Sequence, residues 1–162
     1  MPLEAQRIAI TGLGTVSALG RDARSTFTAL CAGQRGTGPL SLFEPRGLAC
    51  SVAAEVRGLG EDPALSRTDA LALVAAREAL AMAALRPSAT RVGLALGGTT
   101  GGLFETEREG ARERAGVAEF DWARRFISHP LSNGVRVLSE AVGPFVCAAT
   151  VCSACSSGAV DD

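Results

Sequence analysis

Lysine and tyrosine are absent from this sequence of 162 residues, so all 16 basic side chains are arginine. We attribute this bias, together with the abundance of alanine, to GC-rich codons. The formal net charge is −1, and no basic stripe is visible along the chain. This charge balance gives no electrostatic case for a nucleic-acid partner.

The sequence also lacks any apolar run near the roughly 20 residues that a membrane-spanning helix needs. The first seven residues lack the charged and apolar regions of a signal peptide. We therefore expect a cytoplasmic protein with no membrane partner. The odd number of cysteines in a sequence without an export signal indicates free thiols rather than a disulfide scaffold. The five cysteines are Cys31, Cys50, Cys147, Cys152 and Cys155.

Helix-start signals are clear at two positions. Asp22 is a typical N-cap, and Ser66 with Asp69 is a variant of the capping box. The segment that follows Ser66 is apolar nearly all round, which suggests burial on more than one face. The charged residues after Phe104 favour a solvated helix face. The expected helices are 23–32, 66–85, 104–114 and 131–142.

Apolar, β-rich runs alternate with these helices. The expected strands are 7–10, 48–56, 91–96 and 145–151. We expect the last of them to be buried, and residues 48–56 to form an edge strand. Hydrophobic residues make up 47% of the chain and charged residues 20%, which is typical of a globular domain. The alternation predicts an α/β layered fold with a mixed, largely buried sheet flanked by helices.

Cys155 follows the last predicted strand and precedes the small residues 156–159. A helix starting at this point would place its positive end and its unpaired N–H groups at the thiol. Such groups stabilise a thiolate and can bind an oxyanion during acyl transfer. A buried structural role for Cys155 remains equally open on the residues alone, since unpaired cysteine is often part of a core.

Several segments in the same order resemble β-ketoacyl synthases. The opening Arg-Ile-Ala-Ile-Thr-Gly-Leu-Gly resembles the first strand and loop of that family. The segment Ser-Ala-Cys-Ser-Ser-Gly-Ala, which contains Cys155, resembles the family's nucleophile segment. The matching segments are 7–20, 67–80, 91–103 and 143–159.

This resemblance implies a thiolase-like fold in which Cys155 accepts an acyl group from an acyl carrier protein thioester. A carbanion from decarboxylated malonyl-carrier protein would then attack the acyl-enzyme, in fatty-acid or polyketide synthesis. One oxyanion donor would be the backbone N–H of Cys155. The resemblance implies no metal and no organic cofactor. It implies a homodimer, or pairing with another synthase chain.

The resemblance also implies two basic residues that lie downstream of Asp162. We therefore expect residues 1–162 to be a β-ketoacyl synthase N-terminal domain, truncated at the nucleophile segment. The acidic ending Val160-Asp161-Asp162 departs from the family pattern, which favours a shortened or split chain. Such a chain would leave apolar faces of its sheet uncovered. We expect it to be marginally stable alone, or to associate.

Other features have weaker functional interpretations. His129 is the only histidine, and a loop or packing role is favoured over catalysis. Cys152 and Cys155 have the spacing of a redox or zinc motif, without enough further ligands for zinc. Gly12-x-Gly14-x-x-Ser17 resembles a dinucleotide-binding fingerprint in which serine replaces the third glycine. Three cysteines, Cys31, Cys50 and Cys147, are interpreted as core.

Two alternatives to an active synthase stay open. The chain could be a non-catalytic remnant or interaction subunit that pairs with a separate chain. More weakly, it could be a nucleotide-binding Rossmann domain.

Overall fold

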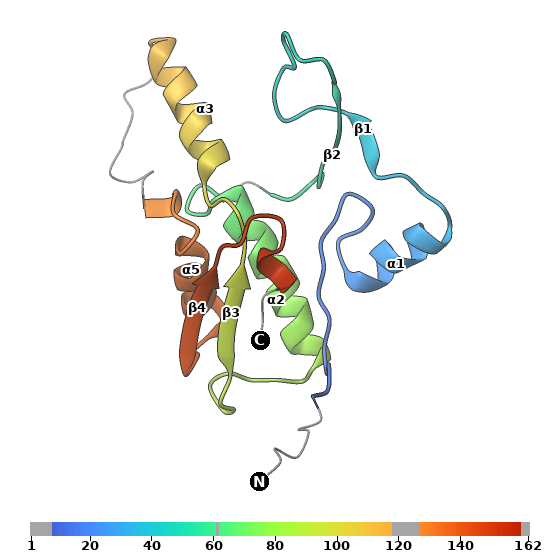
Figure 1. Cartoon of the computed structure of the whole chain (residues 1–162), viewed down its shortest axis with the longest axis vertical. Helices are drawn as coiled ribbons and strands as arrows, with labels where there is room; N and C mark the ends of the chain where they lie inside the picture. Colours follow the sequence, from blue (N-terminus) through green and yellow to red (C-terminus); the bar gives the residue numbers. More distant parts are fainter. Residues whose placement is uncertain (1–7, 61, 118–126, 160–162) are drawn as a thin grey trace.

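The computed structural model describes residues 8–60, 62–117 and 127–159 (Figure 1). All four predicted helices are present, which confirms a mixed α/β architecture. In chain order the elements are α1 Ala23–Cys31, β1 Thr37–Pro39, β2 Val52–Ala54, α2 Arg67–Met82, β3 Gly93–Gly97, α3 Leu103–Arg114, α5 Asn133–Val142, β4 Cys147–Val151 and the 3₁₀ turn η1 Ser157–Ala159. No helix in the described ranges has the length and apolarity needed to cross a membrane.

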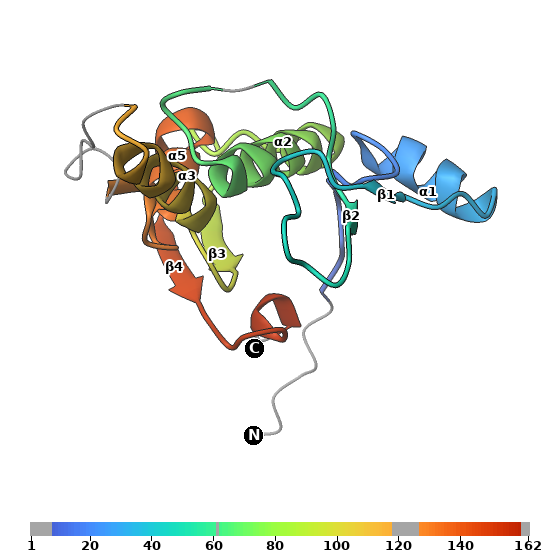
Figure 2. The ribbon, with the colours of Figure 1, turned by 90° about the horizontal axis from the view of Figure 1, so that it is seen from above.

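Strands β3 and β4 are parallel, with Gly93 opposite Cys147 and Gly97 opposite Val151. Helix α5 contacts both strands and packs against α2. Figure 2 shows α2 and α5 on one side of the two strands and η1 on the other. Among the described residues, helices therefore cover one face of the sheet, and η1 lies on the other, which we call the open face.

Helix α2 joins α5 through a buried carboxylate. The N-cap is confirmed, because the Asp69 N–H donates to Ser66 Oγ at 3.0 Å. Asp69 is only 3% exposed, and its Oδ2 accepts from Ser66 Oγ and Asn133 Nδ2, each at 2.7 Å. A buried carboxylate needs such donors to offset its lost hydration. The contact therefore ties the start of α2 to the start of α5.

A second carboxylate of α2 holds the N-terminal segment. Glu78 accepts the Thr15 N–H at 2.9 Å and the Ala23 N–H at 2.8 Å. Gly14 allows this approach, because a Cβ there would lie 1.9 Å from the Ala75 carbonyl oxygen. The nearby Gly12 also lies close to the helix backbone, since a Cβ there would collide with the Ala79 carbonyl oxygen. Close packing on α2 thus accounts for the glycine pair that resembled a dinucleotide fingerprint.

The predicted strand over residues 7–10 is wrong for its described part, residues 8–10, which form no strand. Arg7 lies outside the described residues. Ile8 is 95% exposed and Ile10 82% exposed. A strand forms only when its backbone pairs with another strand. No described segment pairs with residues 8–10, so their apolar pattern was not sufficient to form a strand.

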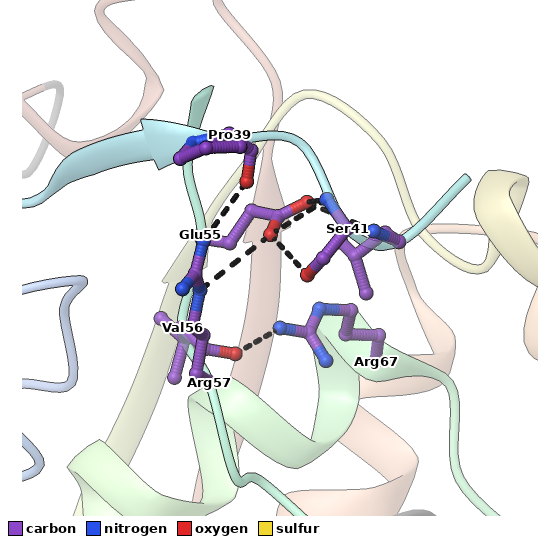
Figure 3. A network of polar contacts seen from close by, with 7 residues as sticks. Pro39, Ser41, Glu55, Val56, Arg57 and Arg67 are labelled. Carbon is purple, nitrogen blue, oxygen red and sulfur yellow. Dashed lines mark hydrogen bonds and ion pairs between the residues drawn. The ribbon is translucent and has the colours of Figure 1, made fainter. Parts of the chain in front are cut away.

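The predicted strand 48–56 is shortened to β2, which pairs antiparallel with β1. Beyond β2, Glu55 is buried, and its carboxylate accepts from Ser41 Oγ at 2.6 Å and from the backbone N–H groups of Ser41 and Leu42. Figure 3 shows the Ser41 and Glu55 side chains pointing toward one another. These donors lower the pKa of Glu55 to about 2, the Ser41 hydroxyl contributing most. Glu55 therefore fastens the segment after β1 to the end of β2.

The predicted burial of three cysteines and of the last strand is wrong. Cys31, Cys50 and Cys147 are all exposed. In β4, the first three residues are exposed and only Thr150 and Val151 are partly buried. For Cys147 and β4 the physical reason is the open sheet face, since the Cys147 thiol lies against Gly93. The solvated face predicted for 104–114 is confirmed, except that Glu105 is buried and accepts the Arg67 N–H at 2.7 Å.

Replacing Gly14 by alanine should destabilise the chain by about 1–3 kcal/mol, because the new Cβ would collide with the Ala75 carbonyl. Gly60→Ala is the matched control, since a Cβ at Gly60 would meet nothing within 4 Å. Urea denaturation followed by circular dichroism measures both variants. Equal midpoints for the two variants would contradict the packing of this segment on α2.

The Glu55 contacts should make stability depend on pH. The pKa of Glu55 is lower in the folded chain than its ordinary value of 4.5, so its contribution is complete above that value and is lost as pH falls toward 2. Glu55→Gln should therefore flatten the acid side of the stability curve. Glu44→Gln should not, because Glu44 is an exposed partner of Arg46. Denaturation midpoints between these pH values test the difference, and identical acid slopes in all three proteins would refute it.

Candidate active site

Cys155 lies in a tight turn between β4 and η1, and its side chain is exposed. Ala154, directly before it, has a φ of +49°. This left-handed conformation costs an alanine about 1–2 kcal/mol. Non-glycine residues held in such conformations cluster at functional sites. The turn thus exposes the thiol to solvent, and Ala154 adopts a strained backbone conformation next to it.

Three donors converge on the carbonyl oxygen of Ala154. Ser157 Oγ donates at 2.6 Å, Thr99 Oγ1 at 3.2 Å and the Ser157 N–H at 3.2 Å. Ser157 is 3% exposed, and its Oγ also accepts the Ser153 N–H at 2.8 Å. The buried Ser157 hydroxyl therefore bridges two backbone groups of the turn, and the Thr99 hydroxyl links the turn to the loop after β3.

These contacts also orient a hydrogen-bond donor at Cys155. The Ala154 carbonyl and the Cys155 N–H belong to one planar peptide group and point in opposite directions. Fixing the carbonyl with three donors therefore fixes the direction of the N–H. Within the described residues, the Cys155 N–H has no hydrogen-bond acceptor. It is available to bind a developing oxyanion next to the thiol.

The end of β3 positions this turn. A Cβ at Gly97 would lie 2.4 Å from the Ser157 carbonyl oxygen, so only glycine lets the chain pass this closely over the open sheet face. The Gly98 N–H extends the β3–β4 pairing by donating to the Val151 carbonyl at 3.1 Å. The described helical turn begins at Ser157, two residues after Cys155, rather than at Cys155 itself.

The other sequence candidates lie around this turn with different contacts. Cys152 is an exposed thiol that forms no disulfide with Cys155. The described residues contain no group of three histidine, cysteine or acidic side chains able to hold a metal. His129 is half-buried, with Nδ1 3.0 Å from Thr106 Oγ1, a contact that supports a packing role.

Sequence reasoning singled out Cys155 but missed Thr99 and Ser157. A serine two residues after a turn cysteine gives a weak local signal, because serine hydroxyls often bond the backbone three residues before. Thr99 gives none, since it meets Ala154 only through the pairing of two distant strands.

Ser157→Ala should destabilise the chain by about 1–3 kcal/mol, because the Ser153 N–H and the Ala154 carbonyl both lose the buried hydroxyl that they share. Ser156→Ala is the matched control. Its hydroxyl donates to the Ser153 carbonyl from an exposed position, so the cost should stay within about 0.5 kcal/mol. Urea denaturation compares the two variants. A Ser156 variant as unstable as the Ser157 variant would contradict the assigned role.

Residues 5–161 match the family described as "Beta-ketoacyl synthase, N-terminal domain". The 3-oxoacyl-[acyl-carrier-protein] synthase 2 of Coxiella burnetii is 37% identical over 114 residues, which cover 62% of this chain and 27% of that protein. A putative polyketide beta-ketoacyl synthase 1 of Streptomyces halstedii is 30% identical over 174 residues, which cover 94% of this chain and 40% of that protein.

Among solved structures, the ishigamide ketosynthase/chain length factor superposes with a TM-score of 0.76 at 23% identity, over 89% of this chain and 39% of that one. A beta-ketoacyl synthase from Burkholderia phymatum gives a TM-score of 0.72 at 23% identity, over 93% of this chain and 40% of that one. The chain thus spans 27% to 40% of the length of these four proteins. Its fold is the thiolase-like fold of ketosynthases, which displaces the Rossmann alternative. The match over residues 5–161 shows that the chain belongs to the β-ketoacyl synthase family.

Proposed function

We propose that Cys155 is the acyl-accepting nucleophile of a β-ketoacyl-[acyl carrier protein] synthase. The observation that carries this proposal is the turn itself, in which an exposed thiol follows a strained Ala154 and lies beside an oriented N–H that has no acceptor among the described residues. A nucleophile and an oxyanion donor on the same residue are suited to acyl transfer from a thioester.

The first step is a thioester exchange. The Cys155 thiolate attacks the carbonyl carbon of an acyl thioester on a carrier protein, and a carbon–sulfur bond forms. The oxyanion of the tetrahedral intermediate accepts the Cys155 N–H. Collapse of the intermediate breaks the bond to the carrier sulfur, and the carrier leaves as a thiolate that takes up the proton lost by Cys155. The acyl group is then bound to Cys155 as a new thioester.

The second step is the condensation implied by family membership. A malonyl thioester loses carbon dioxide, and the resulting carbanion attacks the acyl carbonyl on Cys155. The product is a β-ketoacyl thioester two carbons longer, and the Cys155 thiolate is regenerated. The resemblance places two basic residues for this step downstream of Asp162. In this proposal residues 1–162 form an N-terminal synthase domain, and the basic residues come from further polypeptide.

The same proposal includes an acyl carrier protein as partner and a second synthase chain as neighbour, in the cytoplasm. Exposed apolar side chains support association. Phe27 is 67% exposed and Leu30 58% exposed on α1, while Ile8 and Ile10 lie open before it. Phe27 and Leu30 are three residues apart on α1 and so share one helix face, and an exposed apolar face is typical of protein interfaces. The family's relatives carry both fatty-acid and polyketide synthase names, and either pathway fits this chemistry.

A second candidate is a non-catalytic interaction subunit. The observation that favours it is the small buried core, whose hydrophobic members in the described residues are Ala29, Leu73, Val137 and Leu138. Such a core favours a role completed by another chain. This candidate predicts that Cys155 forms no acyl-enzyme in the chain alone.

Incubation of the full chain with an acyl-[acyl carrier protein] thioester, followed by intact-mass spectrometry, tests the proposal. We expect a mass gain equal to one acyl group, because the exposed thiol and the N–H need no other residue for the first step. Cys155→Ala should abolish this gain. Cys152→Ala is the matched control and should retain it, since Cys152 is equally an exposed thiol in the same segment.

A mass gain that persists in the Cys155 variant would contradict the proposal. A wild-type chain that remains unmodified would favour the interaction subunit. Circular dichroism of each protein shows whether the variants keep the fold.

A further inference from the structure

A cleft of about 370 Å³ lies between the loop that leads into α1 and the β1–β2 hairpin. Residues 17–21 and 35–38 form much of its wall, together with Glu55 and Arg57. Three arginines, Arg21, Arg35 and Arg57, line this one cleft, and Glu55 is its only carboxylate within the described residues. A guanidinium group stays protonated at any physiological pH. The wall therefore carries two more positive than negative charges, because three arginines oppose one glutamate.

The guanidinium of Arg21 is held by neutral groups. Its Nη2 donates to the carbonyl oxygen of Arg57 at 3.1 Å and to that of Gly58. These bonds fix the position of the side chain without cancelling its charge. They also bring Arg21 against the backbone of a second arginine of the cleft.

Arg57 is held in a similar way. Its Nη2 donates to the Pro39 carbonyl at 2.9 Å, and its Nε lies 3.8 Å from Glu55 Oε2 (Figure 3). The Glu55 oxygens already accept the hydroxyl of Ser41 and the N–H groups of Ser41 and Leu42. Glu55 keeps its negative charge and offsets one arginine of the cleft, which leaves two guanidinium charges without a carboxylate inside it.

Arg35 completes the set without any recorded polar partner among the described residues. Some exposed arginines outside the cleft pair with carboxylates, and others have no side-chain hydrogen bond or ion pair within the described residues, among them Arg24 and Arg77. Arg46 lies 2.8 Å from Glu44, and Arg136 lies 2.7 Å from Glu140. Like charges gathered in one cleft repel one another unless an anion joins them. Three guanidinium groups around a single carboxylate therefore favour an anion that comes from outside the chain.

We propose that Arg21, Arg35 and Arg57 form a binding site for a phosphate group. Planar guanidinium groups match phosphate oxygens with paired N–H donors, and several around one concave site bind it more selectively than a single surface charge. The volume leaves room for a phosphate and a small attached group. Cys155 takes no part in this site, so the inference stands apart from the proposed acyl transfer.

Isothermal titration calorimetry on the full chain tests the site with inorganic phosphate and with O-phosphoserine, against chloride at matched ionic strength. We expect saturable phosphate binding that weakens as salt is added. Equal affinities would identify free phosphate as the ligand, and tighter binding of O-phosphoserine would identify a phosphate ester. Both results support the site.

Arg35→Gln should weaken phosphate binding by about tenfold or more, since one charge-assisted contact is lost. This change should leave the fold intact, because Arg35 anchors no described residue. Arg46→Gln is the matched control and should bind as the wild type does. Arg35→Lys should recover part of the affinity through charge without the paired donors.

Three results would overturn the inference. They are absence of saturable phosphate binding, equal binding by the wild type and Arg35→Gln, and binding of a polyglutamate peptide without binding of phosphate. The last result would assign the arginines to an acidic protein surface instead.

Discussion

Two carboxylates of helix α2 hold the separate segments of this chain together. Asp69, at the start of the helix, accepts donors from its own N-cap and from Asn133 of α5. Glu78, further along, accepts the N–H groups of Thr15 and Ala23. Few large apolar side chains are buried among the described residues. These charge-assisted bonds therefore fix the relative positions of segments that a larger core would fix by packing. Helix α2 is therefore the element against which the remaining segments are placed.

A chain of contacts connects α2 with the sheet and then with the turn that holds Cys155. Helix α5, fastened by Asn133, covers one face of β3 and β4. The other face stays open, and the absence of a side chain at Gly97 lets Ser157 cross it closely. Ser157 then fixes the Ala154 carbonyl and with it the Cys155 N–H. The turn that holds Cys155 thus depends on helix packing on the opposite side of the sheet.

The sequence predicted those features that are decided locally. The N-caps at Asp22 and Ser66 are contacts within four residues, and both helices begin where these residues indicate. Burial was predicted less well, because it depends on distant partners. Cys31 and Cys147 have core-like residue types but face surfaces that no described element covers. Likewise, the apolar residues 8–10 have strand propensity without a strand to pair with.

The same distinction applies to the candidate site. Cys155 could not be separated from a core cysteine by composition or spacing, and family resemblance singled it out. Neither the residue pattern nor the resemblance explains how the Cys155 N–H is oriented. The structure does, because donors from both sides of the turn fix the Ala154 carbonyl. Thr99 comes from the loop after β3, whereas Ser157 follows the thiol by two residues. In the proposed reaction, a donor oriented in this way is in place before the acyl group binds, so an oxyanion there would require little rearrangement of the backbone.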